Sequence, residues 1–95
     1  MTDLFMLTKP PGSTRAKLCL ELVKRSPDPV LYLFCDGVFH LVRKQDLPKA
    51  RIVICRDDAL TRGVPIEDDG AYSQDEFYER MVHDMMEDAD QVYTF

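Results

Sequence analysis

Two short apolar segments constrain the fold of this chain more than any other feature. They are Val30–Cys35, with the sequence VLYLFC, and Arg51–Cys55, with the sequence RIVIC. Neither segment alternates apolar and polar residues, as a strand with one solvated face does, so both faces of each strand should be covered. Strands of this kind occur in parallel sheets flanked by helices, and the sequence therefore predicts an α/β fold.

The remaining sequence indicates further strands and helices. Leu4–Leu7 is a third short apolar run, and Gln91–Phe95 is typical of a last strand. Apolar residues recur at helical spacing over Ala16–Val23, and either Ser13 or Thr14 can cap a helix that begins there. Strands and helices thus alternate along the chain, which favours right-handed crossovers between parallel strands.

We expect a single domain over residues 1–95. It should be a small three-layer sandwich, with a mostly parallel sheet of about four or five strands and helices on both faces. The segment Ser73–Glu76 matches a capping box and should open the last helix. In the common doubly wound order, strand 1 lies between strands 2 and 3. Cys35 and Cys55 would then be about 10 Å apart, too far for a disulfide.

The charge and the cysteine content exclude several classes of function. The net charge is −5, whereas binding to nucleic acid or an anionic membrane needs an excess of Lys and Arg. No apolar run approaches the roughly 20 residues of a membrane span, and the N-terminus lacks the basic start of a signal peptide. Three cysteines without C-x-x-C spacing favour reduced thiols over a disulfide scaffold or a zinc ribbon. We therefore expect a cytoplasmic protein without a metal or other cofactor.

The carboxyl ends of three predicted strands should meet at one rim of the sheet, where ligands bind in open parallel sheets. These ends are Thr8–Ser13, Cys35–Gly37 and Cys55–Asp57. The first could present backbone N–H groups to an anion at a helix start, although it lacks both glycine-rich nucleotide motifs. An ordinary strand-to-helix turn is the alternative. The residues expected at this rim, besides Cys55, are Thr8, Gly12, Ser13, Cys35, Asp36, Gly37, Arg56 and Arg62.

Cys55 is the first candidate for chemistry, because it ends a strand and precedes a predicted helix. A helix N-terminus favours a thiolate by about 0.3–1 kcal/mol, and Arg56 acts in the same direction. Asp57 and Asp58 act against it, since nearby negative charge disfavours the thiolate. The alternative is a buried thiol that packs like a small hydrophobe at the end of a core strand. Cys35 has the same position on the preceding strand and the same alternative.

Three segments carry a family resemblance: LTKPPGSTRAKLCLELV, VLYLFCDGV and RIVICRDDALTRGV, the last with the spacing C-x-x-x-A-x-x-R-G. Together, over roughly residues 4–66, they resemble the DsrE/DsrF/DsrH family, which includes the TusB, TusC and TusD sulfur-relay subunits. The resemblance implies a three-layer α/β sandwich that assembles as a trimer or hexamer. It also implies that Cys55 carries persulfide sulfur. Arg56–Asp58 departs from the small apolar residues of the active branch, and the short chain is closer in size to the supporting DsrH/TusB branch.

Three hypotheses of function follow. The first is a sulfur-relay protein, or a subunit of such a complex, with sulfurtransferase-like transfer of persulfide sulfur through Cys55. The second is a non-catalytic oligomeric subunit that binds a protein through the rim and its acidic surface. The third is a binder of small anions or nucleotides at Thr8–Thr14. The expected partners are sulfur donor and acceptor proteins or paralogous subunits, in a homo- or hetero-oligomer.

Overall fold

A computed structural model describes residues 2–66 and 70–95 of the chain, without the side chains of Lys44 and Gln45. The described residues form one five-stranded sheet in the order β4-β3-β2-β1-β5, and every neighbouring pair is parallel. The strands are β1 Asp3–Leu7, β2 Pro29–Leu33, β3 Arg51–Cys55, β4 Ala71–Tyr72 and β5 Gln91–Thr94. The predicted small three-layer α/β sandwich is confirmed.

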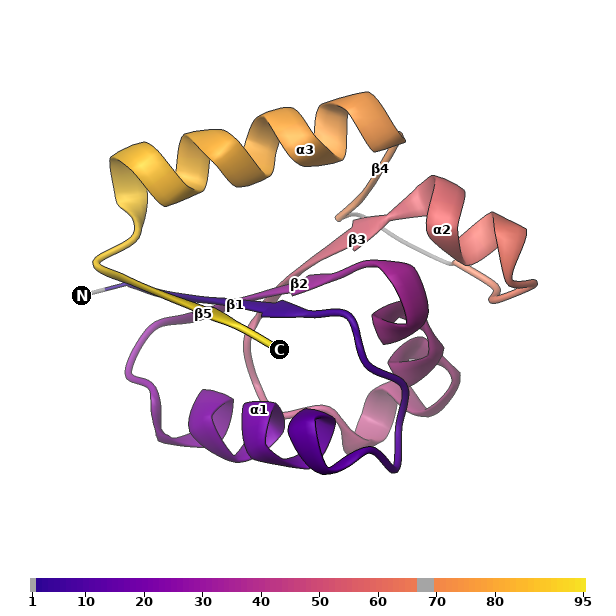
Figure 1. The fold of residues 1–95 in the computed structure, drawn as a ribbon, viewed down its shortest axis with the longest axis horizontal. Helices are drawn as coiled ribbons and strands as arrows, with labels where there is room; N and C mark the ends of the chain where they lie inside the picture. The colour runs from indigo at the N-terminus through magenta and orange to yellow at the C-terminus, as the bar shows by residue number, and fades with distance from the viewer. Residues whose placement is uncertain (1, 67–69) are drawn as a thin grey trace.

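Helices cover both faces of the sheet (Figure 1). One face carries α1 and the 3₁₀ helix η1, the other carries α3, and α2 lies near one end of the sheet. The helices are α1 Thr14–Arg25, η1 Cys35–Asp46, α2 Arg56–Thr61, α3 Gln74–His83 and the π-helical turn η2 Asp84–Asp88. None of the helices in the described ranges has the length and apolar character that a bilayer crossing needs.

The non-alternating strands are buried on both faces, as their sequences predicted. On the α3 side, Leu4 and Met6 of β1 pack in one cluster with Phe77 of α3. On the α1 side, the intervening residues Phe5 and Leu7 pack in a second cluster with Cys19 and Val23 of α1. Successive residues of β1 therefore serve opposite layers of the core, which is why this strand tolerates no polar alternation.

The strand order corrects the sequence-based expectation, because β2 rather than β1 occupies the place beside β3. Leu33 of β2 lies opposite Ile54 of β3. Right-handed crossovers on one face of a sheet advance in one direction, so the connections through α1 and η1 add β2 and then β3 on the same side of β1. α3 crosses the other face and returns the chain to β5 at the opposite edge. The ends of β2 and β3 are consequently neighbours, and the separation of about 10 Å expected for Cys35 and Cys55 does not apply.

Local hydrogen bonds explain where the helices near the rim begin and end. The Ser13 hydroxyl accepts the Ala16 N–H at 3.0 Å and caps α1, as predicted. α2 ends at Thr61, and Gly63 follows its C-cap with a φ of +69°, which suits the left-handed position after a helix. α3 begins after Ser73, but the capping box is not formed among the described contacts. The N–H of Gln74 instead donates to a carboxylate oxygen of Asp57 at 2.8 Å, which ties α3 to α2.

Candidate functional site

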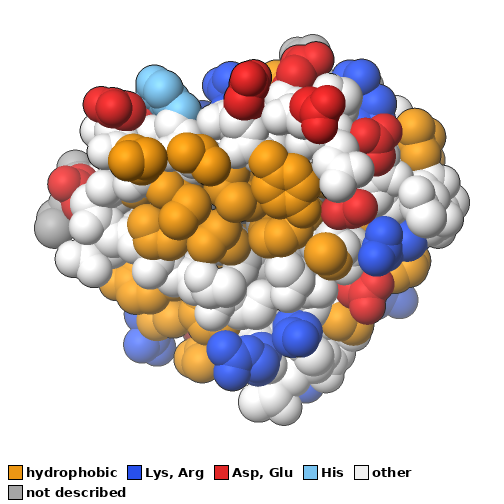
Figure 2. Space-filling view, turned by 45° about the horizontal axis from the view of Figure 1, so that its top comes forward, with side chains coloured by type: hydrophobic (Ala, Val, Ile, Leu, Met, Phe, Trp, Pro, Cys, Tyr) orange, Lys and Arg blue, Asp and Glu red, His pale blue; other side chains and the backbone are white. Residues whose placement is uncertain are grey.

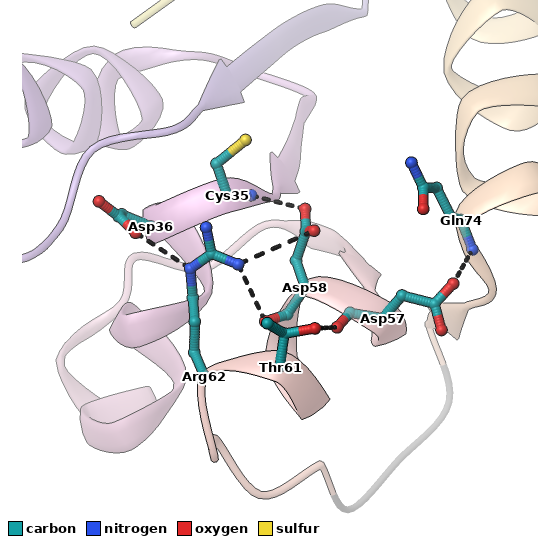
Figure 3. A network of polar contacts seen from close by, with 7 residues as sticks. All are labelled: Cys35, Asp36, Asp57, Asp58, Thr61, Arg62 and Gln74. Atoms are coloured by element: carbon teal, nitrogen blue, oxygen red, sulfur yellow. Dashed lines mark hydrogen bonds and ion pairs between the residues drawn. The ribbon is translucent and has the colours of Figure 1, made fainter.

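Cys35 is the exposed thiol at the carboxyl rim of the sheet. It follows the end of β2 and adopts φ +51°, the left-handed region that non-glycine residues rarely occupy. Such a conformation costs about 1–3 kcal/mol and persists only where its surroundings impose it. Here the N–H of Cys35 donates to a carboxylate oxygen of Asp58 at 2.7 Å, which fixes the backbone of the turn. The strained turn directs the thiol away from the polar network below it (Figure 3).

That polar network joins η1 to α2 through one arginine (Figure 3). Arg62 Nε lies 3.0 Å from a carboxylate oxygen of Asp36, and Arg62 Nη1 lies 3.8 Å from one of Asp58. Arg62 Nη1 also donates to the backbone carbonyl of Asp58 at 3.2 Å. Asp58 thus binds the Cys35 N–H with one oxygen and faces Arg62 with the other. The structure therefore brings together two pairs of rim residues that lie far apart in the sequence, Cys35 with Asp36 and Asp58 with Arg62.

Gly37 is required by the close approach of η1 to β1. A Cβ at this position would overlap the backbone carbonyl of Leu7 at the end of β1. The turn after β2 can therefore pack against the end of β1 only because residue 37 is a glycine and has no side chain. Within the segment VLYLFCDGV, the glycine has this steric role at the rim.

Cys55, the first candidate from the sequence, lies inside the core. It is 0% exposed and packs in the cluster beneath α3 with Tyr32 and Phe77. Burial raises the pKa of its thiol, partly offset by the backbone N–H groups of Asp58 and Asp57. The helix N-terminus therefore acts on Cys55 as expected, but desolvation outweighs it.

The acidic and basic residues after Cys55 have structural partners that the sequence did not indicate. Arg56 donates to the carbonyl of Ala71 in β4 at 2.9 Å, and Asp57 receives the first N–H of α3. These residues thus connect α2 to its neighbours. Their departure from the small apolar residues of the resembling family coincides with contacts that hold the rim together.

Tyr78 is a rim residue that the sequence analysis missed. The pKa of its phenol is raised by burial first and then by the negative charges of Asp58, Cys35 and Cys55. Its ring packs edge-on against Phe34, the residue before Cys35, with ring centroids 6.1 Å apart. The helical position of Tyr78, beside the buried Phe77, was visible in the sequence, but its closeness to β2 and β3 depends on how α3 crosses the sheet.

In the turn that follows β1, the polar groups of Thr8 and Ser13 form hydrogen bonds within the protein. The hydroxyl and the N–H of Thr8 both donate to the carbonyl of Phe95, at 2.8 and 2.9 Å. The N–H of Ser13 donates to Pro10, and the Ser13 hydroxyl caps α1. Gly12, at φ +93°, provides the bend. Thr8, Gly12 and Ser13 thus form a strand-to-helix turn, and they do not join the Cys35 network.

Two grooves flank these elements in the described structure. One, of about 640 Å³, lies between α3 and β3–β4 and carries mixed charges, including Arg51, Glu79 and Arg80. The other, of about 630 Å³, lies between the start of α1 and η1 and is mostly apolar. The buried His40 lines the second groove and bonds the Lys9 carbonyl through Nε2 at 3.1 Å.

One cluster in the described ranges could offer metal ligands. His83, Asp84 and Asp88 each place a ligand atom within 4.8 Å of the others. His83 and Asp88 are exposed, and Asp84 accepts a hydrogen bond from the buried hydroxyl of Tyr32. Structural zinc sites use four ligands in most cases, and this cluster offers three. We therefore interpret it as an exposed acidic helix end.

The architecture and the rim define a small α/β protein with an all-parallel five-stranded sheet and one exposed cysteine at a strand end. Neither the protein-family models nor the curated proteins give a match to the sequence. Among solved structures, the chain is similar to Tm0979 from Thermotoga maritima, determined in solution by NMR. The two share 20% sequence identity with a TM-score of 0.61, over 92% of this chain and 99% of that one. At this identity the likeness supports the fold alone.

Proposed function

We propose that this protein is a sulfur-relay carrier or subunit that receives persulfide sulfur on Cys35. The proposal is supported mainly by the difference in solvent exposure among the three cysteines. Cys35 is exposed at the strand-end rim, whereas Cys55 and Cys19 are each 0% exposed. The resemblance of the sequence to the DsrE/DsrF/DsrH proteins supports the sulfur-relay class. That resemblance matches Cys55, and the proposal moves the entry point to the end of the neighbouring strand.

The proposed step is a transfer between two sulfur atoms. The Cys35 thiolate attacks the outer sulfur of a donor persulfide, R–S–SH, and a new S–S bond forms as the donor S–S bond breaks. The products are the Cys35 persulfide and the donor thiolate, and the proton stays on the transferred sulfur. A second thiolate then attacks the outer sulfur of the Cys35 persulfide and takes it away. No oxidant or reductant is consumed in either step.

The buried cysteines are unsuited to the first step. Thiol exchange needs an accessible thiolate, and burial raises the pKa of Cys19 to about 12. The pKa of Cys55 is raised by the same cause. Reduced thiols of this kind agree with a cytoplasmic location, which we propose together with the function.

The proposal is tested by intact-mass measurement after incubation of the reduced protein with glutathione persulfide. Wild type should gain one sulfur, about 32 Da, that a reductant removes. Cys35→Ser should gain none, and Cys55→Ser should gain as much as wild type. Loading that persists in Cys35→Ser and disappears in Cys55→Ser would return the role to Cys55.

A second function, that of a non-catalytic binding subunit, is favoured by the apolar side chains exposed along α3 and η2. Val82 is 53% exposed and Met86 is 79% exposed. A folded protein that takes up no sulfur on any cysteine, yet forms a stable complex through this surface, would establish this second function in place of the first.

A further inference from the structure

The sheet is covered unequally on its two faces. Among the described residues, α3 with its continuation η2 is the only helix over its face, opposite α1 and η1 (Figure 1). β5 pairs with β1 and is exposed at every residue from Gln91 to Thr94. Parallel strands are normally covered on both faces, so the part of the sheet near β5 lacks a covering layer within residues 2–66 and 70–95.

A continuous apolar surface occupies this part of the molecule. We call it the open face, and it consists of Tyr78, Val82, Met85, Met86 and Val92. The first four recur at helical spacing on one side of α3 and η2, and Val92 belongs to β5. Figure 2 shows a continuous hydrophobic patch on this side of the molecule. Patches of this kind on a small protein mark interaction sites.

The open face reaches the proposed entry thiol. The ring of Phe34, the residue before Cys35, packs edge-on against Tyr78 with ring centroids 6.1 Å apart. Tyr78 belongs to the open face, so this contact joins the open face to the residue next to Cys35. A protein lying on the open face would therefore cover the surroundings of Cys35.

Carboxylates border the open face. From Asp75 to Asp90 the sequence contains seven acidic residues and one arginine. Of these, Asp75, Glu87 and Asp90 are exposed outside the mixed-charge groove, whereas Glu76, Glu79 and Asp88 line that groove together with Arg51 and Arg80. Acidic side chains lie along the upper margin of the patch in Figure 2. In a two-fold contact each copy presents the same surface, so a second copy of this chain would place acidic margins near each other.

We propose that the open face is the docking site for a protein partner whose apolar centre is bordered by Lys and Arg, and which brings its own sulfur-carrying cysteine to Cys35. The proposal rests on the proposed function for the role of Cys35. The apolar surface supplies the contact, and the acidic margin selects a basic partner and speeds the encounter at low salt. The bound partner would then also cover the part of the sheet near β5 that lacks a layer.

Two synthetic peptides test this directly. Each is an amphipathic helix of leucine and a charged residue, lysine in one and glutamate in the other, and each ends in a cysteine persulfide. The measured quantity is the rate of sulfur transfer to the protein, with glutathione persulfide as the small donor that needs no docking. Fluorescent peptides without cysteine report binding by anisotropy, whether or not sulfur is transferred.

Val82→Lys is the variant of the open face, and Leu18→Lys is its matched control. Both residues are 53% exposed and both changes add the same charge, but Leu18 lies on α1. We expect the lysine peptide to transfer on the order of tenfold faster than the glutamate peptide at low salt, with the advantage shrinking as salt rises. Val82→Lys should lose most of the rate advantage of the lysine peptide, and Leu18→Lys should keep that advantage.

The outcomes separate the two proposals. Equal binding of both peptides, or equal losses in the two variants, would overturn the docking proposal even if glutathione persulfide loads Cys35. Failure of glutathione persulfide to load the protein would overturn the proposed function, and anisotropy would still decide the docking. Sedimentation showing a dimer that Val82→Lys disperses would assign the open face to a second copy and also overturn the docking proposal.

Discussion

Replacing Cys35 with glycine should stabilise the fold, although glycine is destabilising at most positions. Cys35 holds φ +51°, and a Cβ in the left-handed region costs about 1–2 kcal/mol. Glycine removes that cost but gives the unfolded chain more freedom, which offsets about 0.4–1 kcal/mol. The side chain is exposed, so its removal forfeits little buried surface. We expect Cys35→Gly to be more stable than Cys35→Ala, which keeps the Cβ, by about 0.5–1 kcal/mol.

The assay is reversible unfolding of the two variants in urea and by heat. For a domain of this size, 1 kcal/mol shifts Tm by roughly 4–8 °C. The same pair of substitutions at Leu18, an exposed position within α1, gives the opposite sign as a control, because glycine costs about 1 kcal/mol relative to alanine in a helix. If Cys35→Gly is no more stable than Cys35→Ala, the turn is not strained, and the reasoning from its geometry is refuted.

Three further predictions concern accessibility, sterics and pH. Iodoacetamide should label Cys35 in the folded protein and Cys55 only after denaturant is added, as peptide mapping would show; equal labelling would contradict the assignment of their burial. Gly37→Ala should destabilise the protein by about 2–3 kcal/mol in urea, because the new Cβ meets the carbonyl of Leu7, and an unchanged midpoint would show that this approach is loose. Burial lowers the pKa of His40 below its ordinary 6.5, so the unfolded state binds more protons and stability falls as the pH drops through about 6.5. His40→Gln should flatten that part of the slope in urea midpoints measured from about pH 7.5 to 5, and an identical slope would remove His40 as the cause.

The layers of the fold could be predicted from the sequence, but the strand order could not. The apolar runs of β2 and β3 specify strands covered on both faces, and that pattern is local. The order depends on which face each connection crosses, and this is decided by packing between distant segments. β4 has two residues, Ala71 and Tyr72, too few for any pattern to be visible. Residues 38–42 suited either a helix or an edge strand in the sequence and belong to η1 in the structure.

The difference between the two strand-end cysteines was also outside the reach of the sequence. Both follow apolar runs, and both stand before residues that can start a turn or helix. After β2 the chain enters a left-handed turn that exposes Cys35, whereas α2 begins directly at Arg56 and leaves Cys55 beneath α3. The ion pair between Asp58 and Arg62 lies within α2 at i, i+4 spacing, but we did not predict it from the sequence. The link from Asp58 to the Cys35 N–H depends on β2 and β3 being neighbours.

The most direct measurement uses a variant in which Cys35 is the sole cysteine, made by Cys19→Ala and Cys55→Ala. The folded protein is loaded with glutathione persulfide, desalted and then incubated with a free thiol, and its intact mass is recorded at each stage. We predict a gain of one sulfur, about 32 Da, followed by its loss to the thiol. A folded variant that gains no sulfur, or that retains it against the thiol, would contradict the claim that Cys35 receives sulfur and passes it on.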